Sequence, residues 1–319
     1  MLWFTPAFSV ADIPDLAGKV VIVTGGSSGL GLASAVALAA KGAHVIVSCR
    51  NEDKGNAAVA DIKAKVGVPA ATVEFGVMEQ SDLASVRRFA DWFLAKGLRL
   101  DVLMLNAGVG GMALELVDGV ETYMLVNHLS HMLLAQLLLP KLKESAPSRI
   151  VFVSSTMYLN IIESTVDWQK VFGRQSRATM DMYFQYSYSK LANLQTSNYL
   201  AHLLGSDSGV LVNTAHPGLT TTNVWHNKAN PLSGTWLYYF FMQAVNMASA
   251  TSDQAALTQL YVATHPDIEK NKAAGRFYVP TAAESGQTQL AQDRESQKLL
   301  WEVSEEHIRR ILAEKGVPL

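Results

Sequence analysis

Lys19-Val-Val-Ile-Val-Thr-Gly-Gly-Ser-Ser-Gly-Leu-Gly31 is the stretch that decides the fold of this chain. Five consecutive β-branched residues indicate a strand, a glycine-rich turn follows, and an alanine-rich helical pattern begins directly after it. Gly25, Gly29 and Gly31 allow the backbone to turn tightly and to come close to a phosphate. The following helix N-terminus offers free N–H groups and a positive partial charge. This order predicts a binding site for the pyrophosphate of a nucleotide, although a strand–helix turn without a ligand could contain the same glycines.

Composition limits the classes of protein to which the chain can belong. Its 319 residues are 49% hydrophobic, which is enough for a large core, and its net charge of −2 gives no electrostatic case for binding nucleic acid. A single cysteine, Cys49, excludes a disulfide framework and a cysteine-rich zinc site. His128 and His131 lie close in sequence, but no third ligand follows them, so no metal site is expected.

The chain carries no clear targeting or membrane-spanning segment. No apolar stretch is long enough for a transmembrane helix. Residues 1–16 lack the basic start and long apolar core of a signal peptide, and we expect them to form an N-terminal extension packed on the domain surface. A cytoplasmic location fits these features. Residues 236–242 are strongly apolar and could line a substrate pocket, contact a membrane surface or belong to the core, so peripheral association with a membrane stays open.

Strand and helix patterns alternate along almost the whole chain. Helical patterns cover residues 32–40, 81–96, 121–139 and 184–204, with Ser81 as the expected N-cap of the second. Apolar runs typical of strands covered on both faces lie at residues 20–23, 43–47, 72–75, 102–105, 150–153, 210–214 and 277–279. We therefore expect an α/β fold with a single doubly wound parallel sheet of the Rossmann type, helices on both faces and a C-terminal extension on the substrate side.

One domain over residues 17–319 accommodates this pattern, since the sequence shows no internal repeat and no linker. Two stretches interrupt the alternation, residues 156–185 and residues 219–250, and each follows the end of a predicted strand. Both leave the carboxyl edge of the sheet, where open α/β sheets bind ligands. We interpret them as insertions on the substrate side of the domain.

Tyr186 and Lys190 form a pair with catalytic potential. They are four residues apart in a predicted helix, so their side chains share one face. A free tyrosine has a pKa of about 10, and a nearby ammonium favours the phenolate and lowers that value. The pair can therefore act as a general acid and base. Because this spacing also arises by chance, its weight comes from the surrounding motifs.

Small and polar residues follow two of the predicted strands. Ser155 could hold a carbonyl oxygen, or it could cap the exit of its strand. Asn106, Ala107 and Gly108 would let the backbone approach a cofactor, or form an ordinary turn. Asn127 lies in an apolar stretch, where an unpaired amide costs about 1–3 kcal/mol, so it either stabilises a kink in a helix or organises a water molecule.

The end of the second predicted strand bears on the kind of dinucleotide. An acidic residue there would accept a hydrogen bond from the 2′-hydroxyl of a ribose and favour NAD. The segment Ser48-Cys-Arg-Asn51 has no carboxylate, and Arg50 offers a bidentate partner for a 2′-phosphate. The sequence therefore predicts NADP(H).

Together these segments resemble the short-chain dehydrogenase/reductase family. Six segments match its motifs in order: Thr24-Gly-Gly-Ser-Ser-Gly-Leu-Gly31, Asn106-Ala-Gly108, Asn127, Val153-Ser-Ser155, Tyr186-Ser-Tyr-Ser-Lys190 and Pro217-Gly218. Within the family the chain is most similar to the retinol-dehydrogenase-like branch, on the segments Ser48-Cys-Arg-Asn51, Val126-Asn-His-Leu-Ser-His131, Tyr186-Ser-Tyr-Ser-Lys-Leu-Ala-Asn193, Ala215-His-Pro-Gly218 and Leu300-Trp-Glu-Val-Ser304.

The resemblance implies roles for these residues. Tyr186 would be the general acid/base, and Lys190 would tune it and hold the nicotinamide ribose. Ser155 would orient the substrate oxygen, and Asn127 would hold a proton-relay water. Together with Tyr186 and Lys190, the cofactor would be held by Gly25, Ser27, Ser28, Gly29, Leu30, Gly31, Arg50, Asn106, Ala107, Gly108, Pro217, Gly218 and Thr222. Glu79 stands where family members often carry an adenine-contacting aspartate, and we assign it no role.

The expected reaction is reversible hydride transfer between NADP(H) and a carbonyl or secondary alcohol. Reduction of an activated carbon–carbon double bond and a non-catalytic NADP-binding sensor are the two alternatives. Trp225 and residues 237–242 suggest that the small-molecule substrate is bulky and lipophilic. The apolar helices expected at residues 121–139 and 184–204 match those that pair subunits in many relatives, so a homodimer is also an expectation.

Overall fold

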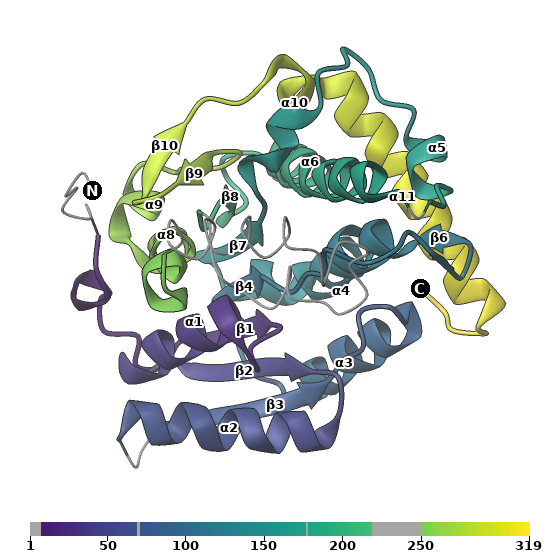
Figure 1. The fold of residues 1–319 in the computed structure, drawn as a ribbon. Helices are drawn as coiled ribbons and strands as arrows, with labels where there is room; N and C mark the ends of the chain where they lie inside the picture. The colour runs from purple at the N-terminus through teal and green to yellow at the C-terminus, as the bar shows by residue number, and fades with distance from the viewer. Residues whose placement is uncertain (1–7, 69–70, 177, 219–249) are drawn as a thin grey trace, which may run out of the picture.

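The computed structural model of the chain describes residues 8–68, 71–176, 178–218 and 250–319 (Figure 1). Its centre is an eight-stranded sheet in the order β10-β9-β8-β7-β4-β1-β2-β3, in which only the β9–β10 pair is antiparallel. The strands are β1 Val20–Thr24, β2 His44–Cys49, β3 Val73–Val77, β4 Val102–Leu105, β7 Ser148–Val153, β8 Val210–Ala215, β9 Phe277–Val279 and β10 Ala283–Ser285. The predicted strands are all present, which confirms a doubly wound sheet of the Rossmann type.

The order of strands reverses beside β1. The chain moves outward from β1 through β2 to β3, and then returns to β4 on the other side of β1. Loops that leave the carboxyl ends of strands at such a switch point diverge, and open α/β sheets bind ligands there. The glycine turn follows β1 and the segment that begins at Asn106 follows β4, so both lie at this point.

Helices cover both faces of the sheet, because successive strand residues point to opposite sides and most are apolar. One core cluster contains Ile22 and Leu103, and the other contains Val21 and Met104. The first cluster includes residues of α3 Leu83–Ala95, α4 Ser130–Glu144 and α6 Thr179–Leu204. The second includes residues of α1 Gly29–Ala40, α2 Glu52–Val66 and α8 Ser252–Thr264.

The remaining elements are short, apart from the C-terminal helix. They are 3₁₀ helices at Val10–Asp12 and Thr156–Asn160, a π-helix at Met124–Leu129, the antiparallel pair of β5 Leu116–Val117 and β6 Val120–Glu121, and the helices α5 Trp168–Phe172, α9 Pro266–Lys270, α10 Gln289–Gln292 and α11 Arg294–Glu314.

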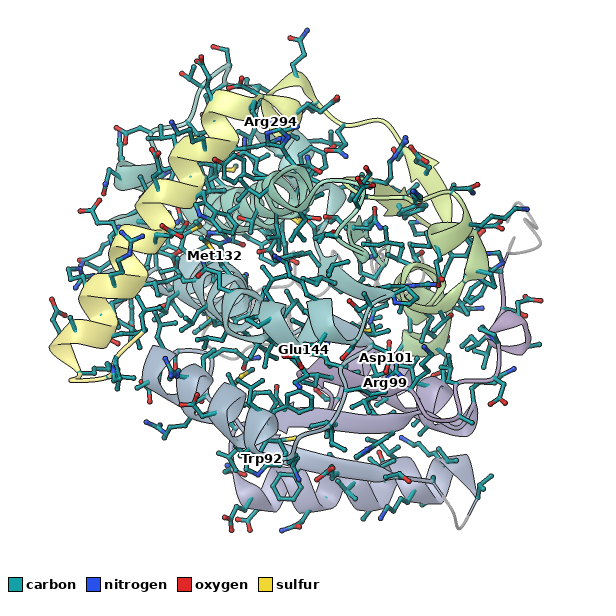
Figure 2. The ribbon with its side chains drawn as sticks, turned by 180° about the vertical axis from the view of Figure 1, so that it is seen from behind. Trp92, Arg99, Asp101, Met132, Glu144 and Arg294 are labelled. Atoms are coloured by element: carbon teal, nitrogen blue, oxygen red, sulfur yellow. The ribbon has the colours of Figure 1, made fainter. Side chains whose placement is uncertain are left out.

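Helix α11 covers the apolar helices on one side of the molecule. Figure 2 shows it in yellow, running obliquely across this side from Arg294. Polar bonds join it to α4, where Gln136 Nε2 donates to Glu305 Oε1 at 3.1 Å, and to α6, where Gln195 Nε2 donates to Ser296 Oγ at 2.9 Å. Its buried Leu300 belongs to the same core cluster as α4 and α6. The helices expected to pair subunits are therefore packed against α11.

Three element boundaries differ from the sequence prediction. Helix α3 begins at Leu83 with Asp82 as its N-cap, because Ser81 instead donates through its N–H and hydroxyl to the Glu79 carboxylate. The single helix expected over residues 121–139 is divided into the end of β6, the π-helix and α4. Helix α6 begins at Thr179, inside the stretch expected to be an insertion before the helix.

The described start of the chain packs on the second core cluster. Phe8 is buried, and its ring contacts the ring of Tyr261 edge-on with centroids 5.4 Å apart. Among the helices that the structure describes, none is both long and apolar enough to span a membrane.

Candidate active site

The turn between β1 and α1 forms a close-packed cradle of glycine backbone. Gly25 and Gly29 have φ of 67° and 52°, a region that favours glycine. A Cβ on Gly31 would lie 2.3 Å from the carbonyl oxygen of Gly25, and a Cβ on Gly26 would lie 2.4 Å from Val47 Cγ1. Ser28 is the N-cap of α1, but its hydroxyl makes no capping bond within the described chain. The first N–H groups of α1 therefore stay available to an anion, as a pyrophosphate site requires.

Thr24 joins the end of β1 to the segment after β4. Its Oγ1 accepts from the backbone N–H of Asn106 at 2.9 Å and of Ala107 at 3.0 Å, and Asn106 Nδ2 donates to the Thr24 carbonyl at 2.9 Å. Thr24 Oγ1 also lies 3.0 Å from Nε2 of the buried His131, whose pKa burial lowers to about 3. Thr24 thus fixes the small residues after β4 beside the glycine turn, a role that the sequence analysis had not assigned to it.

Asn127 lies in the π-helix and clamps the backbone of Val109. Its Oδ1 accepts from the Val109 N–H at 2.7 Å, and its Nδ2 donates to the Val109 carbonyl at 3.0 Å. Nδ2 also donates to Ser189 Oγ at 3.1 Å, and Ser189 donates to the carbonyl of Tyr186 at 2.8 Å. The buried amide therefore finds its partners in the backbone of Val109 and the hydroxyl of Ser189. A water held by Asn127 stays a prediction.

Lys190 extends toward Gly108. A Cβ on Gly108 would lie 3.3 Å from Asn127 Oδ1 and 3.6 Å from Lys190 Nζ, so the segment after β4, the π-helix and α6 meet at this glycine. Lys190 Nζ donates to the Val153 carbonyl at 3.2 Å, and Ser154 Oγ donates to the Lys190 carbonyl at 2.7 Å. Two hydrogen bonds thus join the end of β7 to α6, and Lys190 donates in one and accepts in the other.

Tyr186 is half-buried one helical turn before Lys190. Its ring centroid lies 5.4 Å from Lys190 Nζ, and its ring meets that of Tyr123 edge-on with centroids 6.3 Å apart. Tyr186 packs against a small apolar cluster of Leu114, Tyr123 and Met182, together with Val109 and Met112. The surroundings of the phenol are therefore mostly apolar.

The pKa values of the pair shift in opposite directions. Burial lowers the pKa of Lys190 to about 8 and raises the pKa of Tyr186 above its usual value. The sequence had led us to expect a lowered pKa for the phenol beside the ammonium. The shift is the opposite because burial removes water from around the phenol, which disfavours the phenolate. The phenol is therefore protonated at neutral pH.

Ser155 caps the 3₁₀ helix that follows β7, as the structural alternative predicted. Its Oγ accepts from the Met157 N–H at 3.2 Å. Among the described residues no acceptor takes its hydroxyl hydrogen, and the residue is half-buried. Ser155 can therefore cap the helix with its oxygen and still donate its hydroxyl hydrogen to an oxygen of a bound molecule.

Arg50 and Ser27 lie beside the glycine cradle. Arg50 directly follows β2 and is exposed, and its guanidinium has no hydrogen bond or salt bridge to any residue that the structure describes. Burial raises the pKa of the neighbouring Cys49 thiol, and a hydrogen bond with Ser27 partly offsets that rise. The Glu79 carboxylate is already held by Ser81.

The segment after β8 approaches the same edge of the sheet. Pro217 is buried, and Gly218 has φ of 91°, where a Cβ would lie 3.0 Å from Pro280 Cγ. Thr222, Trp225 and residues 237–242 lie outside the described residues, as does most of the second predicted insertion.

The two histidines considered as metal ligands turn to different partners. His131 Nε2 faces Thr24, whereas His128 Nε2 lies 2.8 Å from Ser304 Oγ of α11. Across residues 8–68, 71–176, 178–218 and 250–319, no group of three or more His, Cys, Asp or Glu side chains could hold a metal ion.

Glu121 is a buried residue that the sequence analysis had not selected. Its carboxylate accepts hydrogen bonds from the backbone at the start of the π-helix and from Gln185, the residue before Tyr186. The sequence signal was a carboxylate at the start of the apolar run that was predicted as one helix, where a buried charge needs partners.

Comparison with protein families and curated proteins gives a consistent set of relatives. A family model described as short chain dehydrogenase matches residues 19–165. The human WW domain-containing oxidoreductase is 34% identical over 98% of this chain and 73% of that protein. Human retinol dehydrogenase 11 is 38% identical over 77% of this chain and 74% of that protein. Mouse retinol dehydrogenase 14 is 36% identical over 90% of this chain and 85% of that protein.

Solved structures share the architecture. An uncharacterised protein from Mycobacterium paratuberculosis superposes with a TM-score of 0.71 at 30% identity, over 95% of this chain and 97% of that one. A short chain dehydrogenase from Burkholderia cenocepacia in complex with NADP gives a TM-score of 0.61 at 25% identity, over 84% of this chain and 100% of that one.

Proposed function

This chain belongs to the short-chain dehydrogenase/reductase family, and on that premise we propose that it interconverts a lipophilic carbonyl compound and its alcohol with NADP(H). Membership makes it an oxidoreductase that uses a nicotinamide cofactor and acts on CH–OH or C=O groups. The observation that carries the proposal is that the side chains of Lys190 and Asn127 both come close to Gly108, at the switch point of the sheet. Tyr186 lies one helical turn from Lys190.

The residues present fit the cofactor. The turn after β1 is built of glycine backbone, and no side chain caps the first N–H groups of α1, which supports a pyrophosphate at this helix N-terminus. The unpaired guanidinium of Arg50 at the end of β2 suits a 2′-phosphate, which supports NADP(H) over NAD(H). When bound, the cofactor supplies or accepts the hydride.

Tyr186 acts as the general acid in the reduction. Its phenol gives a proton to the carbonyl oxygen of the substrate as that oxygen gains negative charge, and Ser155 donates a hydrogen bond to the same oxygen. The raised pKa of Tyr186 keeps the proton in place at neutral pH, which suits the reductive direction. Lys190 stabilises the phenolate that remains, and Asn127 holds the backbone at Val109 that borders the site.

An apolar substrate fits the surroundings of Tyr186. Val109, Met112, Leu114 and Met182 surround the phenol, and they offer no charged group to a polar ligand. Relatives named retinol dehydrogenases are consistent with a lipophilic alcohol or aldehyde.

Replacement of the phenol tests the proposal. We expect Tyr186→Phe to bind NADPH within about twofold of the parent, while turnover of retinaldehyde or a long-chain alkanal falls by about a thousandfold. Tyr199→Phe, a matched change later on the same helix, should leave turnover unchanged. Near-parental turnover in Tyr186→Phe would exclude the assigned role. NADPH binding without turnover of any carbonyl would favour a sensor, and a saturated product from an enone would favour reduction of carbon–carbon double bonds.

A further inference from the structure

Glu121 is a carboxylate with no exposed surface, and three N–H groups point at it. Oε1 accepts from the Tyr123 backbone N–H at 2.8 Å, and Oε2 accepts from the Met124 backbone N–H at 3.1 Å. Oε2 also accepts from Gln185 Nε2 at 2.9 Å. The first two bonds cap the start of the π-helix that carries Asn127, and the third reaches helix α6.

Gln185 connects this carboxylate to the helix of the proposed acid. It is fully buried, it precedes Tyr186 directly, and its Nε2 also donates to the Val171 carbonyl of α5 at 2.8 Å. A second contact follows the same path, because Tyr123, the first N–H donor, packs edge-on against the Tyr186 ring. Tyr123 is itself fixed, since its hydroxyl donates to the Met112 carbonyl at 2.7 Å and accepts from the Met112 N–H at 2.8 Å.

We propose that Glu121 is a positioning residue, which sets Tyr186 relative to Asn127 by tying the start of the π-helix to α6 through Gln185. The inference rests on the function proposed above, since it gives Tyr186 the role of proton donor. A displaced α6 would move the phenol relative to the substrate oxygen, and displacements of about 1 Å can cost on the order of a hundredfold in rate.

A carboxylate suits this role better than an amide or an apolar side chain. It presents acceptors at both oxygens, and all its contacts here are donors. A glutamine would turn an NH₂ group toward at least one of these donors, leaving a buried N–H unpaired. Burial raises the pKa of Glu121 to about 7, and the three N–H bonds act against that rise.

A set of four variants separates positioning from general stability. Glu121→Gln removes the carboxylate, and Gln185→Met keeps the volume of the side chain but cannot donate to Glu121. The double variant closes a thermodynamic cycle. Asp101→Asn is the matched control, because Asp101 is also a buried carboxylate that holds backbone, accepting from the Val20 N–H at 2.9 Å at the amino edge of the sheet. Figure 2 shows Asp101 beside Arg99, with which it forms a salt bridge.

The measurement is kcat for retinaldehyde with NADPH, expressed per NADPH-binding site counted by fluorescence titration. We expect both single variants to lower this kcat by about fivefold or more, with the Kd of NADPH within about twofold of the parent. Because both changes break the same link, the double variant should lose no more kcat than the single variant with the larger loss. Asp101→Asn should lose less than about fivefold. Gln185→Met leaves the backbone bonds of Glu121 in place, so it carries the test alone if Glu121→Gln fails to fold.

Smaller losses in Glu121→Gln and Gln185→Met, additive losses in the double variant, or an equal loss in Asp101→Asn would each overturn the positioning role. Tyr186→Phe, measured in parallel, keeps the two proposals apart. If it retains turnover, the proposed function itself fails. If it loses turnover while Glu121→Gln and Gln185→Met keep theirs, only the positioning role fails.

Discussion

At the scale of single residues, the site contains a buried ammonium, that of Lys190, whose burial lowers the stability of the fold. Lys190 is 4% exposed, and burial lowers its pKa to about 8 from a usual 10.5. At neutral pH the folded protein must therefore keep an ammonium in poor contact with water. Ser155, in contrast, serves the fold and the site at once. Its hydroxyl oxygen caps a helix, while its hydroxyl hydrogen can still bind another acceptor.

Lys190→Met should make the protein more stable and less active at pH 7. The lowered pKa means that the unfolded state binds more protons between about pH 8 and 10.5, so the cost of the buried charge is complete below pH 8 and disappears as the pH rises to about 10.5. We expect a gain on the order of 1–3 kcal/mol at pH 7, measured by urea unfolding, which vanishes near pH 10.5. The exposed Lys143→Met is the control, and a destabilised Lys190→Met at pH 7 would contradict the expectation.

Arg50→Ala should change the preference between cofactors. If the guanidinium binds a 2′-phosphate, its loss removes a charge-assisted contact worth about 1.5–3 kcal/mol, so kcat/KM for NADPH should fall by about 10- to 100-fold. NADH, which lacks that phosphate, is the internal control and should be unaffected. Steady-state kinetics with both cofactors decide the matter, and a parent enzyme that prefers NADH would refute the assignment.

At the scale of elements, the strands could be predicted and the π-helix could not. A strand that is buried on both faces has a continuous run of apolar, β-branched residues, which can be found in the sequence itself. Every strand predicted in this way is present in the structure. The run over residues 121–139 is apolar nearly all round, which predicts one continuous helix. What divides it are partners from distant segments, Val109 and Gln185, which no local pattern in the run records.

The candidate site divides in the same way. Tyr186, Lys190, Asn127 and the glycine turn carry motifs, so the sequence could select them. Glu121 has no motif, and its importance comes from the three donors that the fold brings to it.

Asn127→Ala should weaken the fold through the π-helix. It removes the two bonds that clamp Val109 and the bond to Ser189, and it leaves part of the Val109 backbone unpaired. We expect a loss of about 2–4 kcal/mol in the free energy of unfolding, measured with urea. Asn160→Ala, which breaks one hydrogen bond of 3.5 Å at an exposed residue, should cost less than about 0.5 kcal/mol. Equal effects of the two changes would mean that the clamp contributes little.

At the scale of the whole molecule, α11 decides which surfaces are exposed. It contacts α4 and α6, the helices that the sequence suggested for pairing two subunits. This arrangement depends on contacts between segments far apart in the chain, so the separate helical patterns could not reveal it.

We expect the protein to be monomeric in solution, because α11 packs on α6 and is hydrogen-bonded to α4, the two helices suggested for pairing subunits. Light scattering tests this directly, and a dimer would contradict it. Leu300→Asp places a charge at a fully buried position of α11, which should cost several kcal/mol and lead to self-association on heating. Leu299→Asp, at a neighbouring position that is 47% exposed, should leave both the melting temperature and the mass unchanged.

The place of α11 in the chain also bears on how the protein is made. Helices α4 and α6 leave the ribosome well before Arg294, so their apolar faces meet water, or a chaperone, while the rest is being translated. A nascent chain that stalls or is cut before α11 emerges would display that surface indefinitely. Proteolysis or a premature stop codon in this region should therefore yield aggregates rather than a shorter working enzyme.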